Sequence, residues 1–180
     1  ADTYSKYIDD DDRATKTLFG DGAAISIIKE TRESKGLIDS NFKSDGSRYD
    51  TFFLPSGGTR QIDDGEHDRE ARSPSRMWSG RSDKIKMNGM AVWSAVNSVV
   101  PQQVIKLIKD NGYKVRDIDL FIFHQASQMA LESLMDTLKL GEEQMFSNLG
   151  DKGNTVSASI PIAIKDAENL DRLKRGDLIV

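Results

Sequence analysis

The spacing of apolar residues along the chain predicts where its helices lie. In three segments, apolar residues recur every three or four positions, which places them on one face of a helix. These segments are residues 92–108, 127–138 and 157–170. Asn111-Gly112 is a typical end for the first helix, and Ser127 is a typical cap for the second. Pro161 lies near the start of the third helix, where proline is tolerated.

Short, mainly apolar runs outside these helices predict strands. They cover residues 18–19, 23–28, 118–123 and 177–180, and residues 145–148 are expected to form a short strand or an extended segment. Helices and strands alternate from residue 85 onward, which is typical of an α/β protein built in layers. Residues 31–84 lack such a pattern. We therefore expect a long, loop-rich excursion between two α/β parts, 1–30 and 85–180.

His124 and Asn154 are the strongest candidates for chemistry. His124 follows the 118–123 strand directly, and Asn154 lies in a glycine turn. The loop after a strand is where an open α/β sheet exposes side chains to ligands. Two hydrogen-bond donors aimed at one point form an oxyanion hole, which stabilises charge on a carbonyl oxygen. Each residue alone also fits a structural role, so the prediction depends on the pair.

Composition narrows the classes of function. The 180 residues are 37% hydrophobic and 30% charged, with a net charge of -4, which argues against nucleic acid as the main partner. No apolar run reaches the roughly 18 residues of a membrane span. The chain has no cysteine, and His67 stands in an acidic stretch without a second histidine nearby. We therefore predict no metal site and a cytoplasmic location.

The residues at both ends of the chain predict that it is part of a longer protein. The sequence begins with Ala1 rather than methionine. It ends at Val180, three apolar residues into a predicted strand, and a strand that stops there leaves its backbone groups without a continued ladder.

Several motifs, taken in order, resemble one known family. They are Asp12-Arg-Ala-Thr15, Leu18-Phe-Gly-Asp-Gly-Ala23, Leu54-Pro-Ser-Gly-Gly-Thr-Arg60, Met87-Asn-Gly89, Ile118-Asp-Leu-Phe-Ile-Phe-His-Gln-Ala126, Asn148-Leu-Gly-Asp-Lys-Gly-Asn-Thr155, Ser159-Ile-Pro161 and Leu173-Lys-Arg-Gly-Asp177. His124 and Asn154 are also separated as in that family (154 minus 124, or 30). Over nearly all of its length, the chain resembles the β-ketoacyl-acyl-carrier-protein synthase III family of the thiolase superfamily.

The resemblance implies a thiolase-like α/β fold, in which two similar halves pack in five αβαβα layers. This chain would form the last strands of the N-terminal half and most of the C-terminal half. The implied reaction is a decarboxylative Claisen condensation of an acyl-CoA with malonyl-acyl carrier protein in fatty-acid or related acyl-chain synthesis. The nucleophilic cysteine would lie upstream of Ala1, so the isolated chain is expected to be inactive. The full-length protein would be a homodimer.

The resemblance also implies roles for individual residues. His124 and Asn154 would be catalytic and would hydrogen-bond the malonyl thioester oxygen. Arg13 would stack on the adenine of CoA. The acyl pocket would be lined by Phe19, Ile85 and Met87. No cofactor is implied, because the CoA thioester is a substrate.

Some positions depart from the family pattern. Basic residues that often dock acyl carrier protein are replaced here by Met129, Asp136 and Ser94. Either the docking patch has moved, to Lys84, Lys86 or Lys139, or the partner differs. Two alternatives stay open, an acyltransferase of the thiolase superfamily that uses only CoA substrates, and a non-catalytic thiolase-like binding module. The residue at the upstream nucleophile position distinguishes them.

Overall fold

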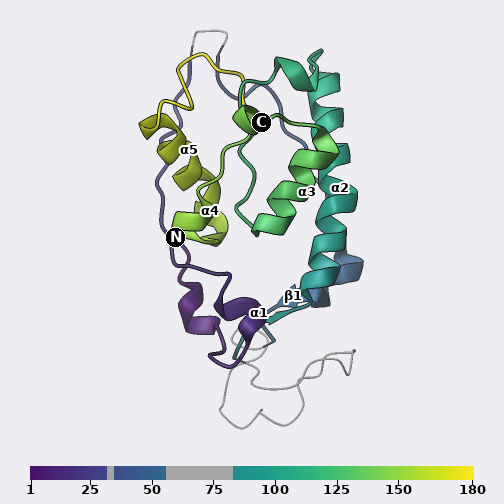
Figure 1. Ribbon diagram of the computed structural model, residues 1–180, viewed down its shortest axis with the longest axis vertical. Coiled ribbons are helices and arrows are strands. Elements are labelled where there is room, and N and C mark those ends of the chain that lie inside the picture. Colours follow the sequence, from purple (N-terminus) through teal and green to yellow (C-terminus); the bar gives the residue numbers. More distant parts are fainter. Residues whose placement is uncertain (32–34, 56–82) are drawn as a thin grey trace.

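Helices cover both sides of a central layer of extended chain. The computed structural model describes residues 1–31, 35–55 and 83–180. Helices α2 (Gly89–Asp110) and α3 (Gln128–Leu138) lie on one side, and α4 (Leu149–Lys152) and α5 (Ser159–Asn169) lie on the other (Figure 1). This arrangement confirms the predicted α/β class.

The remaining elements are short. Helix α1 covers Arg13–Lys16, and strands β1 (Phe52–Phe53) and β2 (Lys86–Met87) form an antiparallel pair. In the described part of the chain, 3-10 helices cover Tyr4–Tyr7, Gly46–Thr51, Val115–Asp117, Glu142–Gln144 and Val156–Ala158.

The predicted helix signals are confirmed at the ends of α2 and α3. Ser127 Oγ accepts a hydrogen bond from Ala130 N at 3.2 Å, which satisfies one of the free donors in the first turn of α3. Asn111 is the C-cap of α2, and Gly112 follows with a φ of 80°, where glycine carries no steric penalty. Helix α2 also continues through Pro101, although proline removes one helix hydrogen bond.

The predicted strands at 118–123, 145–148 and 177–180 lie side by side, as parallel extended segments. Phe121 N donates to Gln144 O at 2.7 Å on one side, and Ile122 N donates to Val180 O at 2.8 Å on the other. Isolated parallel bridges pair Leu120 with Ile179 and Phe121 with Met145. The segment that leads to His124 is therefore held from both sides.

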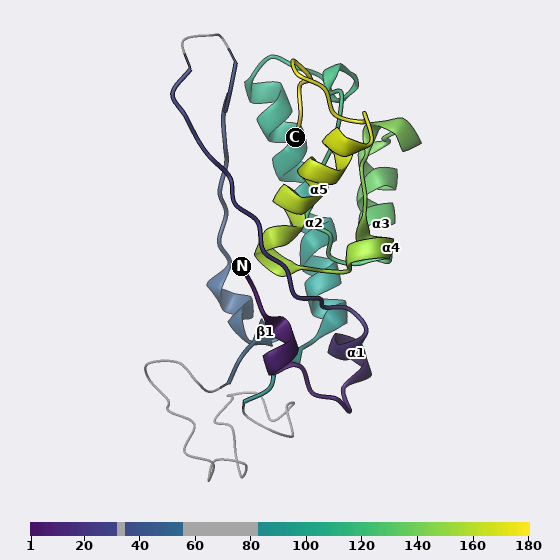
Figure 2. The same ribbon diagram turned by 90° about the vertical axis from the view of Figure 1, so that its left-hand side faces the viewer.

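The strand predicted over 23–28 is not formed within the described part of the chain. Ile25, Ile27 and Ile28 are 94%, 81% and 94% exposed. Figure 2 shows this stretch running along the outside of the layers, near α5. An apolar run becomes a strand only where a neighbour pairs with its backbone, and the sequence pattern alone does not show that neighbour.

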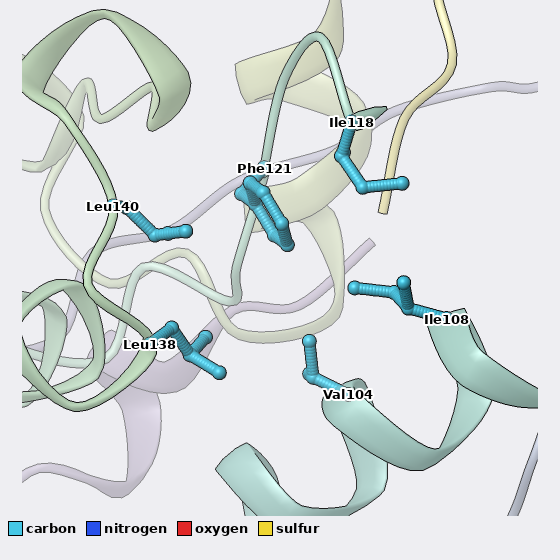
Figure 3. Close-up of a cluster of buried hydrophobic side chains, with 6 residues drawn as sticks. All are labelled: Val104, Ile108, Ile118, Phe121, Leu138 and Leu140. Carbon is cyan, nitrogen blue, oxygen red and sulfur yellow. The ribbon is translucent and has the colours of Figure 1, made fainter. Parts of the chain in front are cut away.

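Two hydrophobic clusters lie on opposite faces of the central segment. Because successive side chains of an extended chain point to opposite faces, Phe121 contributes to one cluster, and Leu120 and Ile122 contribute to the other. The first cluster (Figure 3) contains Val104, Ile108, Ile118, Phe121, Leu138 and Leu140. The second contains Leu120, Ile122, Phe146, Ala163 and Ala167.

Candidate active site

His124 lies where the central segment ends. Its Nδ1 is 2.6 Å from Ser159 Oγ, at the first residue of α5. Ser159 Oγ is also 2.8 Å from the Val156 carbonyl oxygen. The imidazole is thus anchored through Nδ1. The side chain of His124 is exposed, which leaves Nε2 as the nitrogen that can meet a ligand.

The protein around the ring favours neutral imidazole. Partial loss of water lowers the pKa of His124, and the backbone of Val156 opposes part of that effect. His124 is therefore neutral at pH 7, and one of its two ring nitrogens carries a proton.

Stability should depend on pH through this histidine. Because the pKa of His124 in the folded chain lies below its ordinary value of 6.5, the unfolded chain binds more protons near and below pH 6.5. The contribution is fully present above pH 6.5 and is lost as pH falls toward the folded pKa.

Urea unfolding at about pH 7.5 and about pH 5.5 measures this loss. The wild-type chain should lose more free energy of unfolding over that interval than the His124→Asn chain does. His67 is present in both chains, so its own titration cancels in the comparison. If the free energy of unfolding fell by the same amount in both chains, the lowered pKa of His124 would be contradicted.

Asn154 joins three segments and is almost completely buried, with 4% of its surface exposed. Its Oδ1 accepts from Val156 N at 3.0 Å, and its Nδ2 donates to Ala126 O at 3.3 Å. Its backbone pairs in parallel with Phe19. A side-chain amide nitrogen carries two hydrogens, and the bond to Ala126 uses one of them.

The structure therefore places His124 and Asn154 on neighbouring loops. The carbonyl oxygen of Ala126, two residues after His124, accepts a hydrogen bond from the Asn154 side-chain amide. Val156 provides a second link between His124 and Asn154. The Val156 N–H donates to Asn154, while its carbonyl lies beside the serine that anchors His124. Convergence of Nε2 and Nδ2 on one ligand oxygen stays a prediction.

Sequence reasoning missed three residues that shape this site. Val156 has a φ of 55°, an uncommon conformation for a β-branched residue and a sign of local strain. Gln125 is fully buried. Its Nε2 donates to Phe123 O, and its Oε1 accepts hydrogen bonds from Ser147 Oγ and Asn148 N. Ser159 belongs to a family-like motif, so the sequence contained a signal for it. Nothing in the sequence marks Val156.

Two of the predicted acyl-pocket residues contact an aromatic cluster beside Asn154. The ring of Phe19 stacks on Phe52 with centroids 5.7 Å apart, and it lies 5.2 Å from Tyr4. Met87 pairs with Phe52 across the two short strands. Sequence reasoning did not identify Tyr4 and Phe52, whose role depends on contacts between distant segments.

The other two predicted substrate residues, Ile85 and Arg13, lie on separate segments of the chain. Ile85 is buried, and its N–H donates to Tyr7 O at 2.9 Å. Arg13 begins α1 and is exposed. Their contact with CoA or an acyl chain stays a prediction.

The alternative docking lysines differ in exposure. Lys86 is only 9% exposed, so it does not present a surface charge to a partner. Lys84 is partly exposed, and its Nζ donates to Lys6 O at 3.1 Å. Lys139 is exposed at the end of α3. Of the three expected positions, burial therefore argues against Lys86.

Three other features bear on function. Among residues 1–31, 35–55 and 83–180, no three His, Cys, Asp or Glu side chains are grouped so that they could hold a metal. His67 and its acidic stretch lie outside those ranges.

None of the described helices is long and apolar enough to span a bilayer. A shallow hollow between residues 23–26 and α5 includes neither His124 nor Asn154.

Comparison with known proteins identifies the family. The sequence model of 3-oxoacyl-[acyl-carrier-protein] synthase III matches residues 1–46, and the model of that family's C-terminal part matches residues 108–180. The chain belongs to the 3-oxoacyl-acyl-carrier-protein synthase III family. The second match contains both His124 and Asn154, and the first contains Arg13 and Phe19.

Named members of the synthase III family align along almost the whole chain. Beta-ketoacyl-[acyl-carrier-protein] synthase III of Prochlorococcus marinus (strain MIT 9301) is 34% identical over 179 residues, which cover 99% of this chain and 51% of that protein. The protein of the same name from Natranaerobius thermophilus is 34% identical over 182 residues, covering 99% and 52%. The chain spans about half the length of these curated relatives.

A solved synthase III structure shows the same fold. The enzyme from Thermus thermophilus superposes with a TM-score of 0.81 at 28% identity, over 97% of this chain and 50% of that one. The thiolase-like α/β fold expected for the synthase III family is therefore confirmed.

Proposed function

We propose that this chain supplies the His–Asn part of the active site in a synthase III-type acyltransferase. The enzyme would join an acyl group from acyl-CoA to malonyl-acyl carrier protein by decarboxylative Claisen condensation. One observation carries the proposal, namely that Val156 and Ser159 hold His124 and Asn154 on adjacent loops.

The two donors would act on the malonyl thioester. The bond from the malonyl α-carbon to its carboxylate breaks, carbon dioxide leaves, and the electron pair moves toward the thioester oxygen as an enolate. His124 Nε2–H and Asn154 Nδ2–H stabilise that charge by hydrogen bonding. The α-carbon then attacks the acyl thioester on an upstream cysteine. A carbon–carbon bond forms, and the thiolate leaves.

The aromatic cluster supports the location of the acyl pocket. The backbones of Phe19 and Asn154 are paired in an isolated β-bridge. A pocket beside the Phe19 ring would therefore place the acyl chain near His124 and Asn154. Ile85 and Met87 would extend the apolar surface. Arg13 would bind the adenine of CoA, because a planar guanidinium stacks well on aromatic faces.

Partners and location belong to the proposal as well. Acyl carrier protein would dock more weakly than on a strongly basic surface, because Met129 is 59% exposed and Asp136 is exposed on α3. We expect a cytoplasmic homodimer that uses CoA thioesters and requires no further cofactor. Without the cysteine-bearing part, the chain should not catalyse condensation.

Covalent labelling tests the proposal. The full-length protein that contains this chain (the assembled enzyme) is incubated with a panel of acyl-CoAs and analysed by mass spectrometry. An acyl adduct together with carbon dioxide release from malonyl-acyl carrier protein supports the proposal. An adduct without decarboxylation would favour an acyltransferase limited to CoA substrates. No adduct with any acyl-CoA would favour a binding module.

A further inference from the structure

Asp2 bonds the loop of the candidate site from a distant part of the chain. Its carboxylate oxygen Oδ2 accepts one hydrogen bond from Ser157 N at 3.1 Å and another from Ser157 Oγ. Ser157 directly follows Val156, the residue that links Asn154 to His124. The two bonds from Ser157 therefore act beside the part of the loop on which the relative placement of the two site residues depends.

The backbone around Asp2 fixes where its carboxylate lies. Asp2 and Gly22 form an antiparallel bridge, in which Asp2 N donates to Gly22 O at 2.9 Å and Gly22 N donates to Asp2 O at 3.0 Å. Gly22 packs so closely on the site loop that a Cβ there would lie 2.7 Å from Thr155 Cβ. Gly20 N also donates to Asn154 O at 2.9 Å. Asp2 is thus held against the loop by the same segment that pairs with Asn154.

Val156 needs support of this kind. Its φ of 55° lies in the left-handed region, which is costly for a β-branched side chain and persists only where the surroundings hold it. It begins a 3-10 helix whose N-cap, Thr155, makes no side-chain cap bond. Asp2 accepts the Ser157 N–H, one of the donors that the start of a helix leaves free. The Ser157 hydroxyl lowers the pKa of Asp2, so the carboxyl group is ionised at neutral pH and its bonds are charge-assisted.

We propose that Asp2 is a positioning residue, which stabilises the left-handed conformation of Val156 and thereby fixes the placement of the two candidate donors relative to each other. The inference rests on the proposed function, because those donors are the groups proposed to act on the thioester. Left-handed Val156 directs its N–H to Asn154 Oδ1 at 3.0 Å and its carbonyl oxygen to Ser159 Oγ at 2.8 Å. The same serine contacts the His124 ring. An ordinary backbone conformation at Val156 would turn these two groups away from their partners.

Amide hydrogen exchange in the assembled enzyme tests this role without depending on catalysis. In Asp2→Ala, the Ser157 amide loses its partner directly, so faster exchange there is not diagnostic. The Val156 amide bonds Asn154 and not Asp2, yet its exchange should become roughly tenfold faster, as expected when the loop loses a hydrogen bond to a charged group. Mass spectrometry with fragmentation to single residues measures the exchange. Asp2→Asn keeps an acceptor oxygen and should give an intermediate value.

A second substitution tests whether Asp2 acts through Val156. Glycine adopts the left-handed conformation without steric cost, so in a Val156→Gly background Asp2→Ala should change the exchange at position 156 by less than about threefold. Asp21→Ala is the matched control. Asp21 accepts the same pair of bonds from another segment, from Ser5 N at 2.9 Å and from Ser5 Oγ at 2.6 Å. Its loss should leave the exchange at Val156 unchanged.

The reaction itself provides a second readout. Asp2→Ala should slow carbon dioxide release from malonyl-acyl carrier protein by roughly ten- to a hundredfold, the usual effect of misplacing catalytic groups. Acylation of the upstream cysteine should continue at the wild-type rate. In the Val156→Gly background, the loss of decarboxylation caused by Asp2→Ala should be smaller. Thermal unfolding of each variant checks that the fold is intact.

The outcomes distinguish this inference from the proposed function. Unchanged exchange at Val156 in Asp2→Ala, or an equal increase in the Val156→Gly background, would overturn the inference whatever the activity of the enzyme. Wild-type carbon dioxide release from the Asp2→Ala enzyme would overturn it as well. Faster exchange that Val156→Gly suppresses supports it. If the wild-type enzyme released no carbon dioxide while the variants showed that exchange pattern, the proposed reaction would fail and the control of the loop by Asp2 would stand.

Discussion

Replacing His124 with alanine in the assembled enzyme is expected to slow malonyl decarboxylation by about a hundredfold to a thousandfold. The enolate oxygen would lose one of its two donors, and water entering the site is not oriented toward the developing charge. Carbon dioxide release from malonyl-acyl carrier protein measures the effect. Acyl transfer from acyl-CoA should continue, because that step forms the thioester on the upstream cysteine.

Matched variants sharpen this prediction. Asn154→Ala should reduce decarboxylation to a similar extent, because it removes the second donor. It also removes the bonds from Asn154 to Val156 and Ala126, so its thermal stability must be compared as well. His124→Gln keeps an uncharged donor and should give an intermediate rate. Near-normal carbon dioxide release from both alanine variants would exclude the assigned roles.

Local sequence signals predicted the helical layers well. The apolar spacing and the caps at Asn111 and Ser127 predicted α2 and α3. The hydrogen bonds within a helix, and the position of its apolar face, depend on residues only a few positions apart. The His124 loop was also predictable, because a strand followed by a polar residue is a local pattern. These features depend little on distant parts of the chain.

Non-local contacts account for what the sequence did not predict. The run at 23–28 has the composition of a strand, but its isoleucines are exposed because pairing needs a neighbouring strand. Lys86 looks like a surface charge in sequence and is buried in the structure. Val156 bonds Asn154 through a conformation that its side chain disfavours, so intrinsic preference gives no signal for it.

The same non-local packing supports the segment that leads to His124. Phe121 is fully buried three residues before the histidine, and it packs between α2 and α3 (Figure 3). Its backbone also bonds the neighbouring extended segment in both directions, to Gln144 and Phe146. Removing the ring would leave the backbone bonds without the packing that holds the segment against the helices.

Phe121→Ala should therefore lower the free energy of unfolding by about 3–5 kcal/mol, the usual cost of a large cavity in a core. Urea unfolding of the 180-residue chain, followed by circular dichroism, measures the change. Phe42→Ala is the matched control, because Phe42 is 92% exposed, and its loss should change the free energy of unfolding by less than about 0.5 kcal/mol. Equal effects of the two substitutions would show that Phe121 is not part of a packed core. The support for His124 would then have to come from its bond to Ser159 and from the hydrogen bonds of Gln125.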